Sequence, residues 1–171
     1  FVAANSLAET AAAVLPRDAY VTCKWPNDVL VEGRKVGGIL LESESGADGN
    51  LDWLVVGAGL NAASYPSWVE FPATSLAAEG AAEAGVDGLL TAFYRRFLAG
   101  LVAWRSIGFA VARRSWLQRA HGLGRPVAVR LDNESLEGTF HTLDADGAMV
   151  LRQNGRDRRI AAGDVFPAWN Q

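Results

Sequence analysis

Apolar residues recur at helical spacing in two long stretches of the chain. The first stretch, residues 1–15, is rich in alanine and predicts a helix. In the second, Asp87 is the predicted N-cap of the longest helix. We expect the apolar stripe of that helix to face the core, and it consists of Leu89, Leu90, Phe93, Phe97, Leu101 and Trp104. Shorter helices are predicted over residues 75–84 and 109–121.

Between the helices the pattern changes to the two-residue period of strands. A short apolar run over residues 19–23 precedes two strands, residues 28–32 and 36–42, which a glycine separates. Two such runs joined at a glycine are a hairpin signal. Residues 51–56 predict a further strand, which contains Trp53 and is expected to be buried.

The last third of the chain predicts short strands with turn sequences between them. The strands are expected over residues 126–131, 135–143, 148–152 and 158–161. Four or five strands in so short a segment are typical of a small barrel, which should pack on the first part of the chain. His141 lies in the second of these strands, where a half-exposed position is expected rather than a ligand.

The net charge also changes toward the last third of the chain. Residues 1–108 hold seven Lys/Arg and twelve Asp/Glu, a net charge of −5, whereas residues 109–171 hold nine and seven, a net charge of +2. We therefore predict a first domain over residues 1–122 and a second over residues 123–171. The basic excess is too small to indicate nucleic-acid binding.

Composition excludes several classes of protein. Half of the residues are apolar and 20% are charged, as in ordinary globular proteins. No apolar run approaches the roughly 20 residues that a membrane-spanning helix needs. Cys23 is the single cysteine and there are two histidines, so neither an internal disulfide nor a zinc site is expected, which fits a cytoplasmic protein. The sequence begins at Phe1 within an apolar pattern, which suggests a piece of a longer protein.

Charged and amide side chains gather on the first predicted hairpin. They are Lys24, Asn27, Asp28, Arg34 and Lys35. Gly37 and Gly38 follow at once inside a strand, where paired glycines often mark the close approach of a ligand or of another backbone. Cations beside bare backbone could hold an anionic small molecule. A solvated hairpin with a β-bulge is the alternative interpretation.

A second glycine pair follows the strand over residues 51–56. Gly57 and Gly59 do not make a dinucleotide fingerprint, because the third glycine and the following helix are missing. They could let a ligand lie against the backbone, and Asn61 could then offer a donor and an acceptor to a purine. A simple strand-end turn remains the alternative.

Taken in order, these segments resemble the biotin protein ligases. The resemblance is carried by Lys24-Trp25-Pro26-Asn27-Asp28, Gly33-Arg34-Lys35-Val36-Gly37-Gly38-Ile39-Leu40 with Glu42, and Gly57-Ala58-Gly59-Leu60-Asn61. It implies an α+β fold: a mixed β-sheet with helices, like class II synthetases, followed by an SH3-like barrel. The family's upstream loop, rich in Gly and Arg, has no match here, so the N-terminal part of the catalytic domain is expected to be missing.

The resemblance also implies a reaction and its substrates. Biotin and ATP would form biotinyl-5′-adenylate, with Mg²⁺, and biotin would pass to a lysine of a biotin carboxyl carrier protein. Lys35 would be the catalytic cation, and Lys24 would contact phosphate. Asp28, with Asn27, would hold Mg²⁺, which binds through few carboxylates and phosphate oxygens.

The glycine-rich strands would hold the rest of the ligand. Gly38 and Leu40 would present backbone groups to biotin, Gly57 and Gly59 would line its fused ring, and Asn61 would contact adenine. A homodimer paired through a sheet edge is possible by the same resemblance. The alternatives are a lipoate or octanoate ligase or transferase, which shares the catalytic fold, and a non-catalytic fragment that binds a carrier protein.

Overall fold

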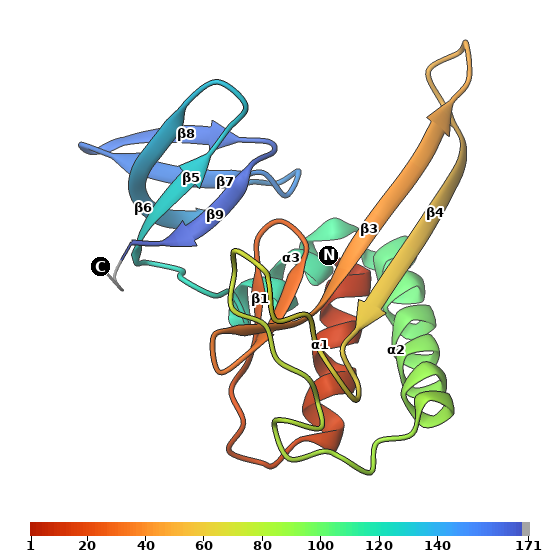
Figure 1. Ribbon diagram of the computed structural model, residues 1–171. Helices are drawn as coiled ribbons and strands as arrows, with labels where there is room; N and C mark the ends of the chain where they lie inside the picture. Colours follow the sequence, from red (N-terminus) through yellow and green to blue (C-terminus); the bar gives the residue numbers. More distant parts are fainter. Residues whose placement is uncertain (169–171) are drawn as a thin grey trace.

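Two antiparallel sheets and three helices make up the protein in a computed structural model that describes residues 1–168 (Figure 1). The first sheet is a meander in the order β1-β2-β3-β4, and its strands are β1 (Val21–Lys24), β2 (Asp28–Val31), β3 (Arg34–Ser45) and β4 (Leu51–Leu60). The second has the order β8-β7-β6-β5-β9, and its strands are β5 (Pro126–Arg130), β6 (Ser135–Leu143), β7 (Met149–Gln153), β8 (Arg156–Ile160) and β9 (Asp164–Pro167).

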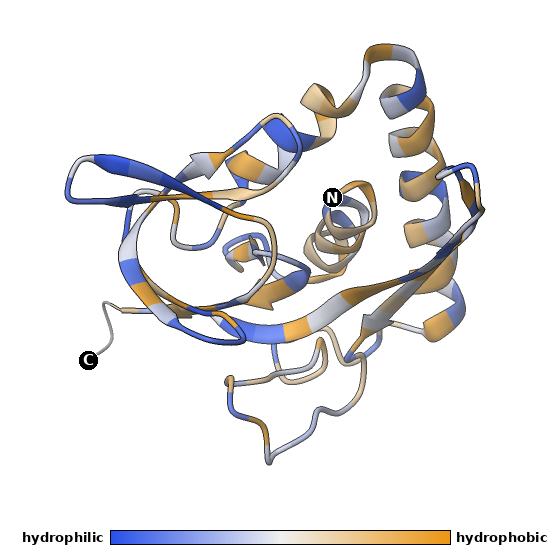
Figure 2. Ribbon diagram, turned by 90° about the horizontal axis from the view of Figure 1, so that it is seen from above, coloured by the Kyte–Doolittle hydropathy of each residue, from blue (hydrophilic) through white to orange (hydrophobic). Residues whose placement is uncertain are grey.

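The first helix lies at the centre of the molecule. The helices are α1 (Val2–Val14), α2 (Val86–Ile107) and α3 (Phe109–Gln118). Helix α1 contacts all four strands of the first sheet and both other helices (Figures 1 and 2). Its alanines allow this close packing, because Ala8 and Ala11 are fully buried. Helix α2 approaches it at Gly100, where an added Cβ would lie 2.8 Å from Val2 Cγ1.

The α+β class is confirmed, and so is the helix expected over residues 1–15. Within the described part of the chain, all pairs of named strands are antiparallel. Parallel pairing occurs there as isolated bridges, Cys23 with Ala120 and Lys35 with Ala73.

Strand β4 differs from the prediction in length and in burial. It continues through Gly57 and Gly59 to Leu60, so the alternative of a strand-end turn there is wrong. The distal halves of β3 and β4 form a long hairpin that extends away from the helices (Figure 1). Trp53 and its neighbours are exposed rather than buried, because none of the described helices covers this half of the hairpin.

The segment before α2 is a chain of turns, so the helix predicted over residues 75–84 is wrong. Ser75 Oγ accepts a hydrogen bond from the Ala78 amide, and Gly80 has a φ of +96° that a helix cannot contain. Asp87 is not the N-cap of α2 either. Gly85 holds that position and Asp87 lies in the first turn, where a carboxylate still favours the helix dipole.

The predicted small barrel is confirmed, with β9 added as a strand that pairs with β5. Its interior is apolar and holds Val127, Val129, Phe140 and Leu151. This interior is continuous with that of the first part, since Trp116 of α3 lies 6.3 Å from Phe140, ring centroid to centroid. His141 is exposed on β6.

Candidate ligand-binding site

Three charged side chains meet at the start of the first sheet. Lys24 ends β1 and Asp28 begins β2, and the two are register partners across the turn. Lys24 Nζ donates to Asp28 Oδ2 at 2.9 Å. Lys35, on β3, places its Nζ 2.5 Å from Asp28 Oδ1, as an ion pair without hydrogen-bond geometry.

The cluster carries one excess positive charge in a partly buried position. The side chains of Lys24 and Asp28 are each 9% exposed, while that of Lys35 is 42% exposed. The ring of Phe71 also lies below Lys24, with its centroid 4.8 Å from Nζ, in a cation–π contact. Because charges interact more strongly away from bulk water, this cluster is suited to bind an anion through Lys35.

Bare backbone lies next to the cations. On β3 and β4, Gly38 pairs with Gly59 and Leu40 pairs with Gly57. A Cβ on Gly38 would lie 3.4 Å from Asp28 Oδ1 and 3.5 Å from Lys35 Cε. The glycines therefore leave the peptide groups of both strands open beside the lysines.

Two asparagines brace these strands. Asn27 Nδ2 donates to Ile39 O at 2.8 Å, and the Ile39 amide donates back to Asn27 O at 2.9 Å. Asn61 Nδ2 donates to Thr74 O at 3.0 Å. Each side chain thus donates one hydrogen bond to a backbone carbonyl, and these bonds fix the geometry of the strand ends.

A cavity of about 830 Å³ unites these groups, within the usual range of small-molecule sites. All nine residues that the sequence analysis proposed as a site line it: Lys24, Asn27, Asp28, Lys35, Gly38, Leu40, Gly57, Gly59 and Asn61. Their individual roles stay predictions.

The sequence analysis missed one wall of this cavity. Glu70 and Phe71 come from the loop after β4, while Arg130, Asp164 and Phe166 come from the barrel. Nothing in their local sequence marks them, because the first two depend on how a long loop folds back and the other three on how the barrel docks.

Arg130 joins the barrel to the loop across this wall. It donates to both carboxylate oxygens of Glu70, at 2.8 and 3.0 Å, and to Asp164 Oδ2 at 3.2 Å. Its guanidinium lies 4.7 Å above the ring of Phe166. Hydrogen bonding from Arg130 lowers the pKa of Glu70, and the two carboxylates raise the pKa of Arg130.

These residues do not fit a protein-bound Mg²⁺. Both oxygens of Asp28 already contact ammonium groups, so a dication there would face two positive charges. Nowhere in residues 1–168 do three or more His, Cys, Asp or Glu side chains gather as metal ligands could. The Mg²⁺ role predicted for Asp28 therefore enters no step below.

A cationic cluster, exposed strand backbone and a cavity of this size are features of a small-molecule site that suits an anion. Comparison with known sequences then identifies the family. The model of the "Biotin/lipoate A/B protein ligase family" matches residues 1–118, and that of the "Biotin protein ligase C terminal domain" matches residues 122–166. The chain belongs to the biotin/lipoate A/B protein ligase family, and the resemblance seen in the sequence is confirmed.

Individual relatives agree with this assignment. A biotin–[acetyl-CoA-carboxylase] ligase of Paracoccus denitrificans is 37% identical over 174 residues, covering 97% of this chain and 71% of the relative. The enzyme of the same name from Mycobacterium tuberculosis is 32% identical over 143 residues, covering 83% of this chain and 51% of the relative. The chain therefore spans between about half and about seven tenths of these two relatives.

Solved structures share the fold. The apo biotin protein ligase of Aquifex aeolicus superposes with a TM-score of 0.81 at 22% identity, covering 98% of this chain and 73% of that one. The same protein in complex with biotin and ATP superposes with a TM-score of 0.77 at 22% identity, covering 96% of this chain and 68% of that one. A biotin protein ligase-like protein of unknown function from Silicibacter superposes with a TM-score of 0.78 at 28% identity, covering 93% of this chain and 68% of that one.

The helices of the described chain are all too short or too polar to cross a bilayer.

Proposed function

We propose that this chain is the part of a biotin protein ligase that forms biotinyl-5′-adenylate and passes biotin to a carrier lysine of a carboxylase. The observation that carries the proposal is the Lys24–Asp28–Lys35 cluster beside the paired glycines of β3 and β4. The names of the relatives support the choice of biotin, and the complex of the Aquifex protein with biotin and ATP supports the two substrates.

In the first step a carboxylate oxygen of biotin attacks the α-phosphorus of ATP, and the bond to the bridging oxygen of the β-phosphate breaks. Negative charge is crowded where the carboxylate meets the phosphate. Lys35 supplies a fixed ammonium there, and one such contact typically contributes ~10²–10³ in rate. Lys24 contacts a phosphate oxygen, and Asp28 holds both lysines in place.

The remaining roles follow from the strands. Gly38 and Leu40 offer peptide groups to biotin, and Gly57 and Gly59 lie along its fused ring. Asn61 uses one of its two amide N–H donors on Thr74, which leaves the second N–H and the carboxamide oxygen to pair with adenine.

In the second step the ε-amine of the carrier lysine attacks the acyl carbon of the adenylate. A C–N bond forms, the C–O bond to phosphate breaks, AMP leaves with its electron pair, and the amine loses a proton. Lys35 polarises the acyl carbonyl. Four further points stay predictions. They are the domain boundary at residue 122, a cytoplasmic location, a possible homodimer and the lack of nucleic-acid binding by this chain.

A lipoate or octanoate ligase or transferase is the second candidate, because the matched family includes lipoate enzymes. The match of residues 122–166 to the biotin ligase C-terminal domain favours biotin. ATP–pyrophosphate exchange with biotin, lipoate and octanoate in turn separates the two.

The test of the proposed site is Lys35→Ala in a protein that is extended upstream of Phe1 to the length of its relatives. We expect biotin-dependent ATP–pyrophosphate exchange to fall ~10²–10³-fold while the fold stays intact. Arg34→Ala is the matched control, because Arg34 is the preceding residue but bonds Glu79 and does not line the cavity.

Exchange near the wild-type rate in Lys35→Ala would remove Lys35 from the catalytic role. If the extended protein is active but the 171-residue chain neither reacts nor binds biotin in calorimetry, the chain is a fragment of the enzyme. Carrier binding without activity in either protein supports the non-catalytic alternative.

A further inference from the structure

The residues on either side of Lys24, Cys23 and Trp25, both make hydrogen bonds to the last third of the chain. On one side, the Cys23 amide donates to Arg119 O at 2.8 Å, and the His121 amide donates to Cys23 O at 2.8 Å. Arg119 and His121 belong to the short segment that leads from α3 to β5. The lysine strand is therefore hydrogen-bonded to the connection that carries the barrel.

On the other side, Trp25 reaches the barrel itself. Trp25 is 2% exposed, and its indole Nε1 donates to Gly147 O at 3.1 Å. Gly147 lies in the turn between β6 and β7, far along the chain. Trp25 lines no part of the cavity, so its place in the Lys-Trp-Pro-Asn-Asp run needs a different explanation from that of its neighbours.

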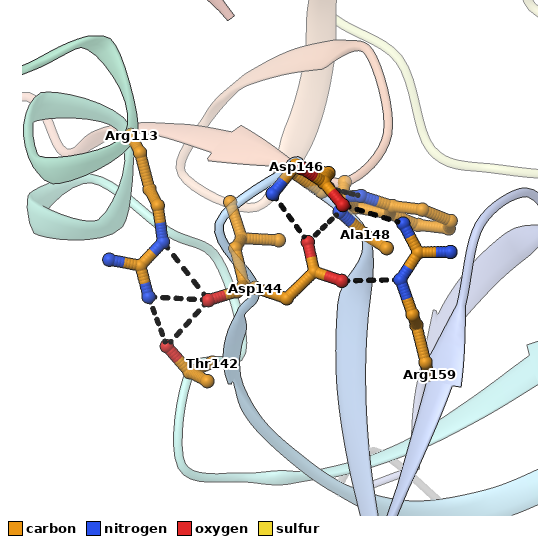
Figure 3. Close-up of polar contacts among 9 residues, drawn as sticks. Arg113, Thr142, Asp144, Asp146, Ala148 and Arg159 are labelled. Atoms are coloured by element: carbon orange, nitrogen blue, oxygen red, sulfur yellow. Dashed lines mark hydrogen bonds and ion pairs between the residues drawn. The ribbon is translucent and has the colours of Figure 1, made fainter. Parts of the chain in front are cut away.

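Polar contacts around Asp144 fix the β6–β7 turn (Figure 3). Asp144 Oδ1 accepts hydrogen bonds from the amides of Asp146 and Ala148, at 2.8 and 2.9 Å. Arg159 Nε donates to Asp144 Oδ2 at 2.5 Å, and Arg113 Nε, from α3, donates to Leu143 O at 3.0 Å. The turn is thus tied to both the barrel and α3.

The turn also has no room to shift toward α1 and α3. A Cβ on Gly147 would lie 2.5 Å from Phe1 Cε2 and 3.2 Å from Phe109 Cζ. The backbone of the turn therefore lies directly on these two rings, which pack edge to face at 5.2 Å.

A third connection reaches Lys24 from the opposite wall. Arg130 of β5 holds Glu70, and the next residue, Phe71, lies under the Lys24 ammonium. Lys24 is thus connected to the barrel through Trp25 and through Phe71, and through Cys23 to the segment that leads into the barrel.

We propose that Trp25 is a positioning residue, through which the docked barrel sets the place of Lys24 in the nucleotide half of the site. This inference rests on the proposed function for its catalytic readout. The barrel then acts on ATP more than on biotin, because the connections described above reach Lys24, whereas the proposed biotin groups lie on β3 and β4.

The test uses Trp25→Phe and Gly147→Ala in the extended protein. We expect the KM for ATP to rise roughly 3- to 10-fold, the scale of one neutral hydrogen bond, with the KM for biotin within about twofold. Gly155→Ala is the matched control, because Gly155 has a similar positive φ, +77° against +90°, but nothing within 4 Å of its Cβ. It should change neither KM.

A second readout needs no activity. In the 171-residue chain, amide hydrogen exchange over residues 21–31 should speed up in Trp25→Phe and Gly147→Ala but not in Gly155→Ala. A lower melting temperature with unchanged KM values and unchanged exchange over residues 21–31 would overturn the inference. If the wild-type enzyme shows no biotin-dependent reaction while the exchange pattern holds, the proposed function fails and the positioning role stands.

Discussion

Asp28 determines what the site can bind at the scale of single residues. One buried carboxylate holds two ammonium groups, which leaves the cluster one positive charge and its most exposed member, Lys35, facing the cavity. A carboxylate with fewer partners could have served a metal ion. The distances favour a different use, the alignment of two lysines for a carboxylate and a phosphate.

The Arg130–Glu70 pair makes a prediction about pH. Since Arg130 lowers the pKa of Glu70, the pair persists above that pKa and opens as the pH falls through it. In Arg130→Gln the pKa of Glu70 should return toward its ordinary value near 4.5. Carbon-13 NMR titration of the Glu70 carboxyl measures this directly.

Arg95→Gln controls for the loss of one positive charge, because Arg95 lies on α2, away from the cavity. An ordinary Glu70 pKa that is the same in wild type and Arg130→Gln would mean that the pair does not form in solution.

At the scale of elements, α2 shows where a sequence pattern is insufficient. The apolar residues that were predicted to form one inward-facing stripe lie on two faces of the helix in the structure. Leu89 is buried, and Phe93 and Phe97 pack against the core as stacked rings. Leu90 is exposed, at the head of a second apolar row that continues through Tyr94, Leu98 and Val102. A helix with apolar residues on two faces does not reveal from sequence which face its neighbours will cover.

Adjacent leucines of α2 test this division. Leu89 is 7% exposed and Leu90 is 64% exposed. In the 171-residue chain, Leu89→Ala should lower the free energy of unfolding by about 2–3 kcal/mol, because it removes buried methyl groups. Leu90→Ala should change it by less than about 0.5 kcal/mol. Urea unfolding followed by circular dichroism gives both values, and equal losses would show that Leu90 is covered in solution.

The hairpin chemistry could be predicted because it is local in sequence. Lys24, Asp28 and Lys35 meet across two tight turns, so a strand pattern was enough to bring them together. Arg130 and Phe166 could not be predicted, since their places depend on how a separate sheet docks. The burial expected for Trp53 failed for a related reason: strand pattern does not say whether another layer covers the strand.

At the scale of the whole molecule, one apolar core runs through both sheets. It passes from α1 through Trp116 to Phe140 and the interior of the barrel. Contacts at the β6–β7 turn and at Arg130 add polar connections on either side of it. The two parts should therefore unfold together.

Calorimetry of the 171-residue chain should show a single transition, with a van 't Hoff enthalpy equal to the calorimetric one. Gly147→Ala should divide or broaden this transition, because it separates the turn from Phe1 and Phe109. Gly155→Ala should only shift it. Two separate transitions in the wild-type chain would show that the barrel is an independent unit.

The packing of the β6–β7 turn against Phe1 and Phe109 limits how genes for proteins of this family can recombine. A crossover in the segment after Gln118 would join the rings of one parent to the turn of another. Because a β-carbon at Gly147 would overlap the ring of Phe1, a chimera keeps this packing only when the incoming turn also has glycine at that place. The barrel and the part of the chain before it are therefore expected to be inherited as matched pairs.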